Sequence, residues 1–163
     1  MIETERLYIT PQSIEEIGTL REKESDPEMK KAYSEMLDAM LHLNGREEWG
    51  SDWKISLKTG EAIGGIGFRG IPDAQGIVEI GYGIDKAYRQ KGYATEALSG
   101  MVKWAMRQNG VQCITAQTEP NNKISQKVLV YNGFSRDGDG EEGPLYKIQK
   151  DVWDSNSMNP KKV

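Results

Sequence analysis

Apolar and polar residues alternate along several short runs of the chain, the pattern of half-buried β-strands. The alternating runs cover residues 1–11, 53–57, 62–69, 77–84, 113–118 and 145–150. A further strand begins at Phe134. The turn-forming sequence from Lys58 to Glu61 predicts that the second and third of these strands form a hairpin.

Between these strands, apolar residues recur at three- and four-residue spacing, which predicts helices. The predicted helices cover residues 13–21, 27–41, 95–109 and 123–131. Ser13 with Glu16 three residues later is a capping-box pattern and marks the start of the first helix. Gly110 and the Asn132-Gly133 pair mark the ends of the last two. The resulting element order, βααβββαβαββ, predicts an α+β fold in which helices pack on a mixed sheet.

Length and composition limit the classes of protein to which the chain can belong. Its 163 residues suit one domain with a true core, predicted to cover residues 1–150, and the few apolar residues of 151–163 predict a loose tail. No apolar run is long enough to cross a membrane. The net charge of −4 lacks a dominant basic face and argues against nucleic-acid binding. Cys113 is the only cysteine and His42 the only histidine, which favours a reducing cytoplasm and argues against a metal site built on either residue type.

The segment from Gly65 to Gly70 matches the G-x-G-x-x-G spacing of dinucleotide-binding loops. That motif requires a preceding strand and a following helix. Here the glycines lie within a predicted hairpin strand, and Pro72 follows them. A closely packed strand is therefore the better interpretation, and no phosphate-binding G-x-x-x-x-G-K-[ST] sequence is present.

A stronger candidate is the segment Arg89-Gln90-Lys91-Gly92-Tyr93-Ala94, which joins the strand at 77–84 to a predicted helix. Unpaired N–H groups and partial positive charge at a helix N-terminus attract anions, and a glycine lets the backbone approach them closely. Arg89 and Lys91 add full positive charges. This pattern predicts a phosphate site, although a solvated basic loop capping a helix is also compatible with it.

Two further motifs specify the phosphate ligand. Asn122 and Ser125 are followed by Gly133-Phe134, and the strand from Glu79 to Ile84 directly precedes the basic loop. Together with [R/Q]-x-x-G-x-[G/A] at 89–94, this combination resembles the GNAT superfamily of acyl-CoA-dependent N-acyltransferases. It is most similar to the branch of ribosomal-protein N-terminal acetyltransferases, and the resemblance runs from Ile2 to at least Leu145. It implies a mostly antiparallel, twisted sheet flanked by helices on both faces.

The resemblance also implies where acetyl-CoA would bind. The loop would hold the pyrophosphate, the end of the preceding strand would pair with the pantetheine arm, and Asn122 would bond the pantetheine or hold its own loop. The implied cofactor residues are Tyr82, Gly83, Ile84, Arg89, Gln90, Lys91, Gly92, Tyr93, Ala94, Thr95 and Asn122. A bulge at the glycine-rich strand is expected to free an N–H near Tyr82 for the developing oxyanion.

The chemistry of acyl transfer to an amine requires proton removal, because a lysine amine has a pKa of about 10.4 and an α-amino group about 8. Glu79 is the candidate base, with a solvated or ion-paired strand residue as the alternative. Many family members place a proton-donating tyrosine where this chain has Leu129, so Ser125 is the candidate donor, with helix capping as its alternative role.

The resemblance also implies an acceptor pocket, one wall of which the first helices and the loop after them would form. Its predicted lining is Tyr33, Met36 and Trp49, with core packing as their alternative role, whereas Trp53 is expected to pack in the core. No metal is expected.

The sequence thus predicts an acetyl-CoA-dependent N-acetyltransferase acting on a small-molecule or peptide amine, and a homodimer is left open because dimers are common in the family. The rival hypotheses are an acyl-CoA sensor with little turnover and a binder of another phosphate compound.

Overall fold

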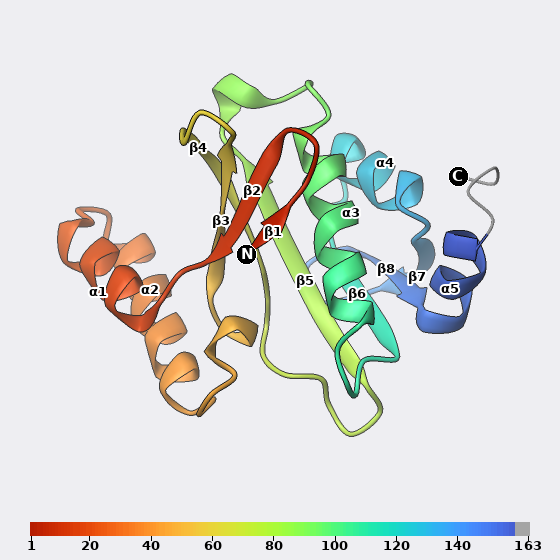
Figure 1. Ribbon diagram of the computed structural model, residues 1–163, viewed down its shortest axis with the longest axis horizontal. Coiled ribbons are helices and arrows are strands. Elements are labelled where there is room, and N and C mark those ends of the chain that lie inside the picture. Colours follow the sequence, from red (N-terminus) through yellow and green to blue (C-terminus); the bar gives the residue numbers. More distant parts are fainter. Residues whose placement is uncertain (159–163) are drawn as a thin grey trace.

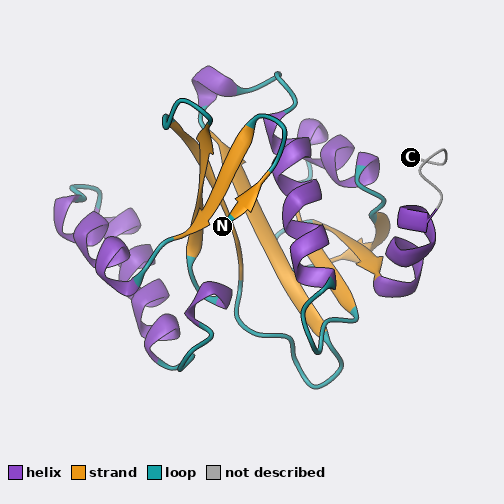
Figure 2. Cartoon of the chain, in the orientation of Figure 1, coloured by secondary structure: helices purple, strands orange, loops and turns teal. Residues whose placement is uncertain are grey.

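The computed structural model of the protein describes residues 1–158, which form one eight-stranded sheet with helices on both faces (Figures 1 and 2). The strand order is β1-β2-β3-β4-β5-β6-β8-β7. The strands are β1 (Ile2–Glu3), β2 (Leu7–Pro11), β3 (Asp52–Leu57), β4 (Ala62–Phe68), β5 (Ile77–Ile84), β6 (Cys113–Gln117), β7 (Ser135–Asp139) and β8 (Pro144–Gln149). All neighbouring strands are antiparallel except β5 and β6, as the predicted fold class requires.

Five α-helices and two short 3₁₀ segments lie between and after these strands in the described residues. The helices are α1 (Ile14–Lys23), α2 (Pro27–Leu41), α3 (Tyr93–Met106), α4 (Lys123–Tyr131) and α5 (Lys150–Met158), with η1 (Glu47–Trp49) and η2 (Lys86–Tyr88). Helices α1 and α2 pack on each other at one side of the molecule, while α3, α4 and α5 gather on the other (Figure 1). None of the helices described for this chain has the length and apolar character that a membrane span requires.

The core lies between the sheet and α3. Apolar residues that alternate along the central strands, such as Ile66 on β4 and Ile80 on β5, are almost fully buried. They meet the apolar face of α3, where Leu98 and Met101 are completely buried. The periodicities of two in the strands and near 3.6 in the helix therefore converge on one interface, which fixes the position of the α3 N-terminus relative to the end of β5.

The element order matches the sequence prediction except at the two ends. The first predicted strand is two strands, because Thr4 turns the chain and its hydroxyl hydrogen-bonds Glu96 of α3. Where the pattern indicated a loose tail, residues 150–158 form α5, and Trp153 packs against the core. The remainder of that tail, 159–163, lies outside the described residues.

Candidate active site

Strands β5 and β6 diverge in the middle of the sheet. Their parallel pairing runs only from Ile77 with Cys113 to Glu79 with Thr115, whereas β5 stays paired with β4 as far as Ile84. Arg69 N–H bonds Glu79 C=O on one end of the β4–β5 pair, and Asp85 N–H bonds Ile63 C=O on the other. Because hydrogen bonding alternates along a strand, the N–H and C=O of Tyr82 point away from β4 into the opening beyond β5.

The free backbone groups of Tyr82 therefore come from strand divergence. The prediction of a bulge in β5 is wrong, because the register of β5 with β4 is continuous from Ile80 to Ile84. The register shift in this part of the sheet lies between β3 and β4, where Ile55 pairs with Gly64 but Ser56 pairs with Ala62, so that Ile63 of β4 is the extra residue. A wedge-shaped opening between β5 and β6, one wall of which offers unpaired backbone groups, can accept an extended ligand that itself carries amides.

The loop that follows β5 presents the N-terminus of α3 beside this opening. Gln90 has a φ of 63° and Gly92 a φ of 82°, and Gly92 is the N-cap residue of α3. No side chain caps this helix, so the N–H groups of its first turn are free for a ligand. Arg89 donates from Nε to Ile84 C=O at 2.8 Å, which ties the loop to the end of β5. The sequence-predicted phosphate residues 89–95 are thus brought together with Tyr82, Gly83 and Ile84.

Arg6 holds this loop from outside, a role that the sequence analysis missed. Its Nε lies 2.7 Å from Glu96 Oε1, and its Nη1 donates to Lys91 C=O at 2.9 Å. Its guanidinium also stacks 4.5 Å from the centre of the Tyr93 ring. Burial raises the pKa of Glu96, but hydrogen bonds from Thr4 and Arg6 outweigh it, so that the net pKa is lowered and the carboxylate stays charged. Arg6 therefore links the β1–β2 turn to both sides of Gly92.

On the α4 side of the opening, two hydroxyl groups meet. The Tyr82 hydroxyl lies 3.0 Å from Ser125 Oγ, and burial raises the pKa of Tyr82 while the bond to Ser125 partly opposes the rise. Asn122 Oδ1 accepts from Ser125 N–H at 3.1 Å, so the Asn122 side chain caps α4. Leu129 is completely buried in the core. Ser125 is paired with a phenol from a neighbouring strand.

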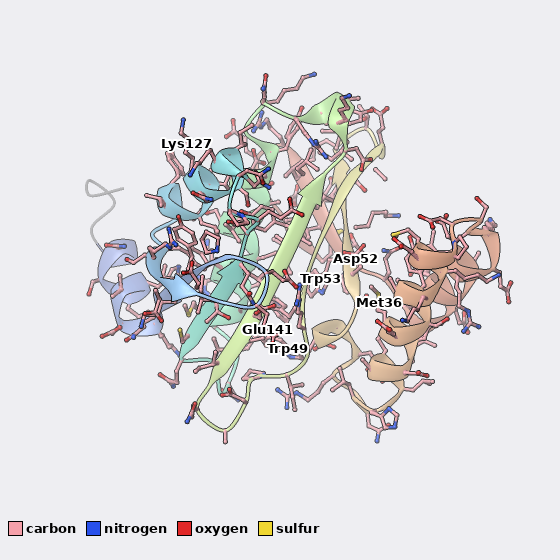
Figure 3. All side chains as sticks on the ribbon, turned by 180° about the vertical axis from the view of Figure 1, so that it is seen from behind. Met36, Trp49, Asp52, Trp53, Lys127 and Glu141 are labelled. Carbon is pink, nitrogen blue, oxygen red and sulfur yellow. The ribbon has the colours of Figure 1, made fainter. Side chains whose placement is uncertain are left out.

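Glu79 lies where β5 and β6 begin to separate, and both of its carboxylate oxygens are engaged. Oε1 accepts from Gln117 Nε2 at 2.8 Å, and Oε2 lies 2.9 Å from Arg69 Nε. Arg69 Nη2 in turn pairs with Glu142 Oε1 at 3.0 Å. The β7–β8 loop, which carries Glu141 and Glu142, thereby crosses toward β4 (Figure 3). Glu79 thus connects β4, β5 and β6 and holds this loop at the margin of the opening.

A second carboxylate, that of Asp52 at the start of β3, faces a cavity of about 530 Å³. Gly65, Gly81, Tyr82, Gly83 and Arg89 are among the residues that line it. The Asp52 carboxylate lies against Gly65, where an added Cβ would stand only 2.6 Å from Oδ1. Burial raises the pKa of Asp52 to about 6.

Asp52 was not among the catalytic candidates of the sequence analysis, which were Glu79 and Ser125. No local motif marks it, because its partners come from β4 and β5. The only signal for its position was the run of glycines opposite it in the predicted hairpin.

Two of the three residues predicted to line an acceptor pocket lie near Asp52. Tyr33 and Met36 are half-buried on α2, and Figure 3 shows Met36 and Asp52 at the gap between α2 and β3. Burial raises the pKa of Tyr33, as do the charges of Glu24 and Asp52. The prediction for Trp49 is wrong: its side chain is 2% exposed, and its ring packs 4.9 Å from that of Phe68 and 5.0 Å from that of Trp104. Trp49 belongs to the core.

Replacement of Asp52 by Asn should increase the free energy of unfolding at pH 7 by about 1 to 3 kcal/mol. The folded-state pKa of about 6 lies above the ordinary 3.8, so the parent protein loses stability as the pH rises from 4 to 7. The amide does not ionise, and the variant escapes this loss. Urea unfolding at pH 4, 5.5 and 7 should show the difference between variant and parent growing with pH. A difference independent of pH would contradict the raised pKa.

In the part of the chain that is described, no group of three or more His, Cys, Asp or Glu side chains is placed to hold a metal ion. The polar groups of the site are therefore backbone amides, two hydroxyl groups, two carboxylates and the cationic side chains of the 89–94 loop.

Comparison with known proteins places this geometry among acetyltransferases. The model of the acetyltransferase (GNAT) domain matches residues 6–135. The chain is 40% identical over 98 residues to the uncharacterized N-acetyltransferase YjdG of Bacillus subtilis, a match that covers 60% of the chain and 58% of YjdG. It is 30% identical over 146 residues to the uncharacterized N-acetyltransferase p20 of Bacillus licheniformis, which covers 83% of the chain and 82% of p20. The chain thus spans less than two thirds of YjdG but most of p20.

Solved structures share the fold. The ribosomal-protein-S5-alanine acetyltransferase from Vibrio fischeri superposes with a TM-score of 0.73 at 18% identity, over 93% of this chain and 97% of that one. The ribosomal L7/L12 α-N-protein acetyltransferase RimL, solved in complex with coenzyme A, superposes with a TM-score of 0.71 at 15% identity, over 91% and 97%. At this identity the likeness establishes the fold.

Proposed function

Because the chain belongs to the GNAT acetyltransferase family, we propose that it transfers an acetyl group from acetyl-CoA to a primary amine in a ternary complex. The observation that carries this proposal is the opening between β5 and β6 beside the uncapped N-terminus of α3. An extended thioester with a pyrophosphate at one end matches both features. A phosphate compound without such an arm would leave the free backbone groups of Tyr82 unused.

In this proposal the pyrophosphate lies on the loop from Arg89 to Thr95, against the first-turn N–H groups of α3 and the charges of Arg89 and Lys91. The pantetheine amides pair with the backbone from Tyr82 to Ile84. This places the sulfur near the paired hydroxyls of Tyr82 and Ser125, which lie on the α4 side of the opening. Asn122 acts on the cofactor through α4, whose first turn it caps.

Replacement of Arg6 by Ala should weaken coenzyme A binding about 5- to 20-fold, in line with the loss of one or two hydrogen bonds to charged groups. The variant loses the bond to Lys91 C=O and the pair with Glu96, so the loop is no longer held in its binding conformation before the ligand arrives. Calorimetric titration with coenzyme A measures the change. The matched control is Arg107→Ala, at the other end of α3, which should bind like the parent. Equal affinity in the two variants would contradict a role for Arg6 in shaping the loop.

The chemical step is direct attack of the neutral amine on the thioester carbonyl carbon. A C–N bond forms, the carbonyl oxygen becomes an oxyanion that the free N–H of Tyr82 stabilises, and collapse of the intermediate breaks the C–S bond. The nitrogen loses a proton to a carboxylate, and the departing thiolate gains one from the Tyr82–Ser125 pair. A thiol of pKa roughly 8.5 is a modest leaving group, so this donor assists the step without being essential to it.

Tyr82→Phe should therefore lower kcat about 5- to 30-fold and leave the affinity for coenzyme A within about 2-fold. The ring and its packing remain, and only the hydroxyl that meets Ser125 is lost. Ser125→Ala removes the other member of the pair and should lower kcat by a similar factor. Stopped-flow measurement of thiol release separates this effect from binding. Full activity in both variants would remove the proposed donor.

The proposal is tested by incubating the protein with acetyl-CoA and a panel of amines, while free thiol is followed with a disulfide reagent. A suitable panel contains a short peptide with a free N-terminal alanine, spermidine, lysine and kanamycin. Amine-dependent thiol release with a mass increase of one acetyl group on the amine is the expected result. Coenzyme A binding without turnover on any amine would favour an acyl-CoA sensor, and no coenzyme A binding at all would contradict the proposal.

A further inference from the structure

We propose that Asp52, and not Glu79, is the general base that takes the proton from the attacking amine. This inference rests on the proposed acetyl transfer and assigns one of its proton-transfer steps. It concerns a residue that lies on β3, outside the strand on which the sequence analysis expected the base.

The two faces of the sheet separate the proton-donating and proton-accepting groups. Trp53, the residue after Asp52, turns toward α3, where its ring packs 5.0 Å from Trp104. Because side chains alternate along a strand, Asp52 faces the opposite side of the sheet, toward Tyr33 of α2. Tyr82 lies in register with Ile66 and Trp53 and shares the α3 face. The thiolate and its donor thus lie on one side, and the Asp52 carboxylate lies on the other, from which an amine can approach.

Glycines keep the space between Asp52 and the opening empty. In the register of the sheet, Asp52 lies opposite Gly67 of β4, which lies opposite Gly81 of β5. Two residues further along β3 on the same face, the corresponding positions of β4 and β5 are Gly65 and Gly83. Added Cβ atoms at Gly81 and Gly83 would meet nothing within 4 Å, so the floor of the cavity is bare backbone. The carboxylate lies over β4 and the opening lies beyond β5, so about two strand spacings, roughly 10 Å, separate the two. An amine nitrogen at the opening and one or two bridging waters fit this distance.

The two carboxylates differ in the contacts of their oxygens. Both oxygens of Glu79 accept hydrogen bonds, from Gln117 and Arg69. The Asp52 side chain has no hydrogen-bond or ion-pair partner within residues 1–158. A base whose pKa lies near 6 is ionised at neutral pH and still accepts a proton readily. The other charged or titratable residues that line the cavity are Tyr82, Asp85, Lys86 and Arg89. Lys54, two residues further along β3, and Tyr33 on α2 also lie on the Asp52 side of the sheet.

In the step so assigned, the nitrogen of the acceptor forms its bond to the acetyl carbon and passes one proton to an Asp52 oxygen through one or two bridging waters. The C–S bond breaks, and the thiolate is protonated from the Tyr82–Ser125 pair on the other face. Asp52 then releases its proton to solvent through the open cavity. No oxidant, reductant or further co-reactant is needed.

The test compares Asp52→Asn with Glu79→Gln in the full chain, with acetyl-CoA and the best acceptor of the amine panel. We expect kcat of the parent to rise with pH through about 6 and then level off. Asp52→Asn should lower kcat at pH 7 by about 100-fold or more and abolish this rise, with coenzyme A affinity within about 2-fold. Glu79→Gln should keep the rise. Gly65→Ala leaves the carboxyl intact but pushes it aside, and it should lower kcat with only a small change in coenzyme A affinity.

An active parent whose Asp52→Asn variant keeps both its kcat and the rise near pH 6 would overturn the inference alone. Loss of the rise in Glu79→Gln instead would make Glu79 the base. A parent that acetylates no amine would contradict the proposed function and this assignment together. Folding of each variant is checked by its urea unfolding midpoint, so that lost activity in a folded protein is read as lost chemistry.

Discussion

Gly92→Glu should abolish coenzyme A binding, with a loss of affinity of at least about 100-fold. Gly92 is the N-cap of α3 and has a φ of 82°, a backbone conformation that residues with a side chain adopt only under strain. The Cβ of a side chain here would lie 3.2 Å from Nη2 of Arg6, the residue whose guanidinium holds the loop. The added carboxylate would also stand beside the proposed pyrophosphate and replace attraction by repulsion. Calorimetry with coenzyme A gives the affinity directly.

Gly92→Ala is the matched control, because it imposes the same backbone strain without the charge. It should weaken coenzyme A binding by a smaller factor, about 3- to 20-fold, because the loop is strained but no negative charge is added beside the pyrophosphate. Since the loop is exposed, both variants should retain a cooperative unfolding transition. Parent-like affinity in Gly92→Glu would mean that the cofactor does not lie on this loop.

Trp49→Ala should destabilise the protein by about 3 to 5 kcal/mol, the usual cost of emptying a large aromatic site in a core. The Trp49 side chain is nearly inaccessible and packs against the rings of Phe68 and Trp104. Trp104 lies on α3, so the cavity left by the truncation would loosen the helix whose N-terminus forms the proposed phosphate site. Equilibrium unfolding in urea gives the free energy.

Trp49→Phe, which keeps an aromatic ring in the cluster, should lose less stability and retain the KM of the parent for the acceptor. Met36→Ala provides the contrast, because Met36 is half-buried on α2, on the side of the helix near Asp52 (Figure 3). Met36→Ala should change the acceptor KM and leave the free energy of unfolding closer to that of the parent than Trp49→Ala does. If Trp49→Ala kept the stability of the parent and raised only the acceptor KM, Trp49 would be a residue of the acceptor pocket and not of the core.

The loop at residues 89–94, between β5 and α3, could be placed from sequence because its signal is local. Residues 89–94 form one continuous segment, and Ser13 with Glu16 forms the predicted capping box within four residues. Strand and helix periods also predicted the element order, since each period reports burial on one face. The break at Thr4 was missed although it is a local turn, in which Thr4 N–H bonds Leu7 C=O and Leu7 N–H bonds the Thr4 hydroxyl. The hydrogen bond from Thr4 to Glu96, 92 residues away, holds this turn against α3.

The candidate site was harder to predict wherever it depends on packing between distant segments. Nothing around Asp52 in sequence indicates that Gly65, Gly81 and Gly83 clear a cavity before it. Trp49 was assigned to a pocket because aromatic residues suit both pockets and cores, and only the contacts with Phe68 and Trp104 distinguish the two.

Two further groups depend on the same kind of long-range contact. The hydroxyl of Tyr82 was overlooked in favour of its backbone, because Ser125 lies 43 residues further along the chain. Glu79 remains a predicted base on sequence grounds, but the contacts of its two oxygens with Gln117 and Arg69 could not be read from its strand.

The most direct test of the account is a crystal structure of the protein with coenzyme A. The account predicts the pyrophosphate on the backbone of residues 89–95 and the pantetheine arm in the opening between β5 and β6. The sulfur should lie within about 4 Å of the Tyr82 or Ser125 hydroxyl and open onto the Asp52 cavity on its far side. Coenzyme A bound elsewhere, or with its sulfur away from that opening, would contradict the account.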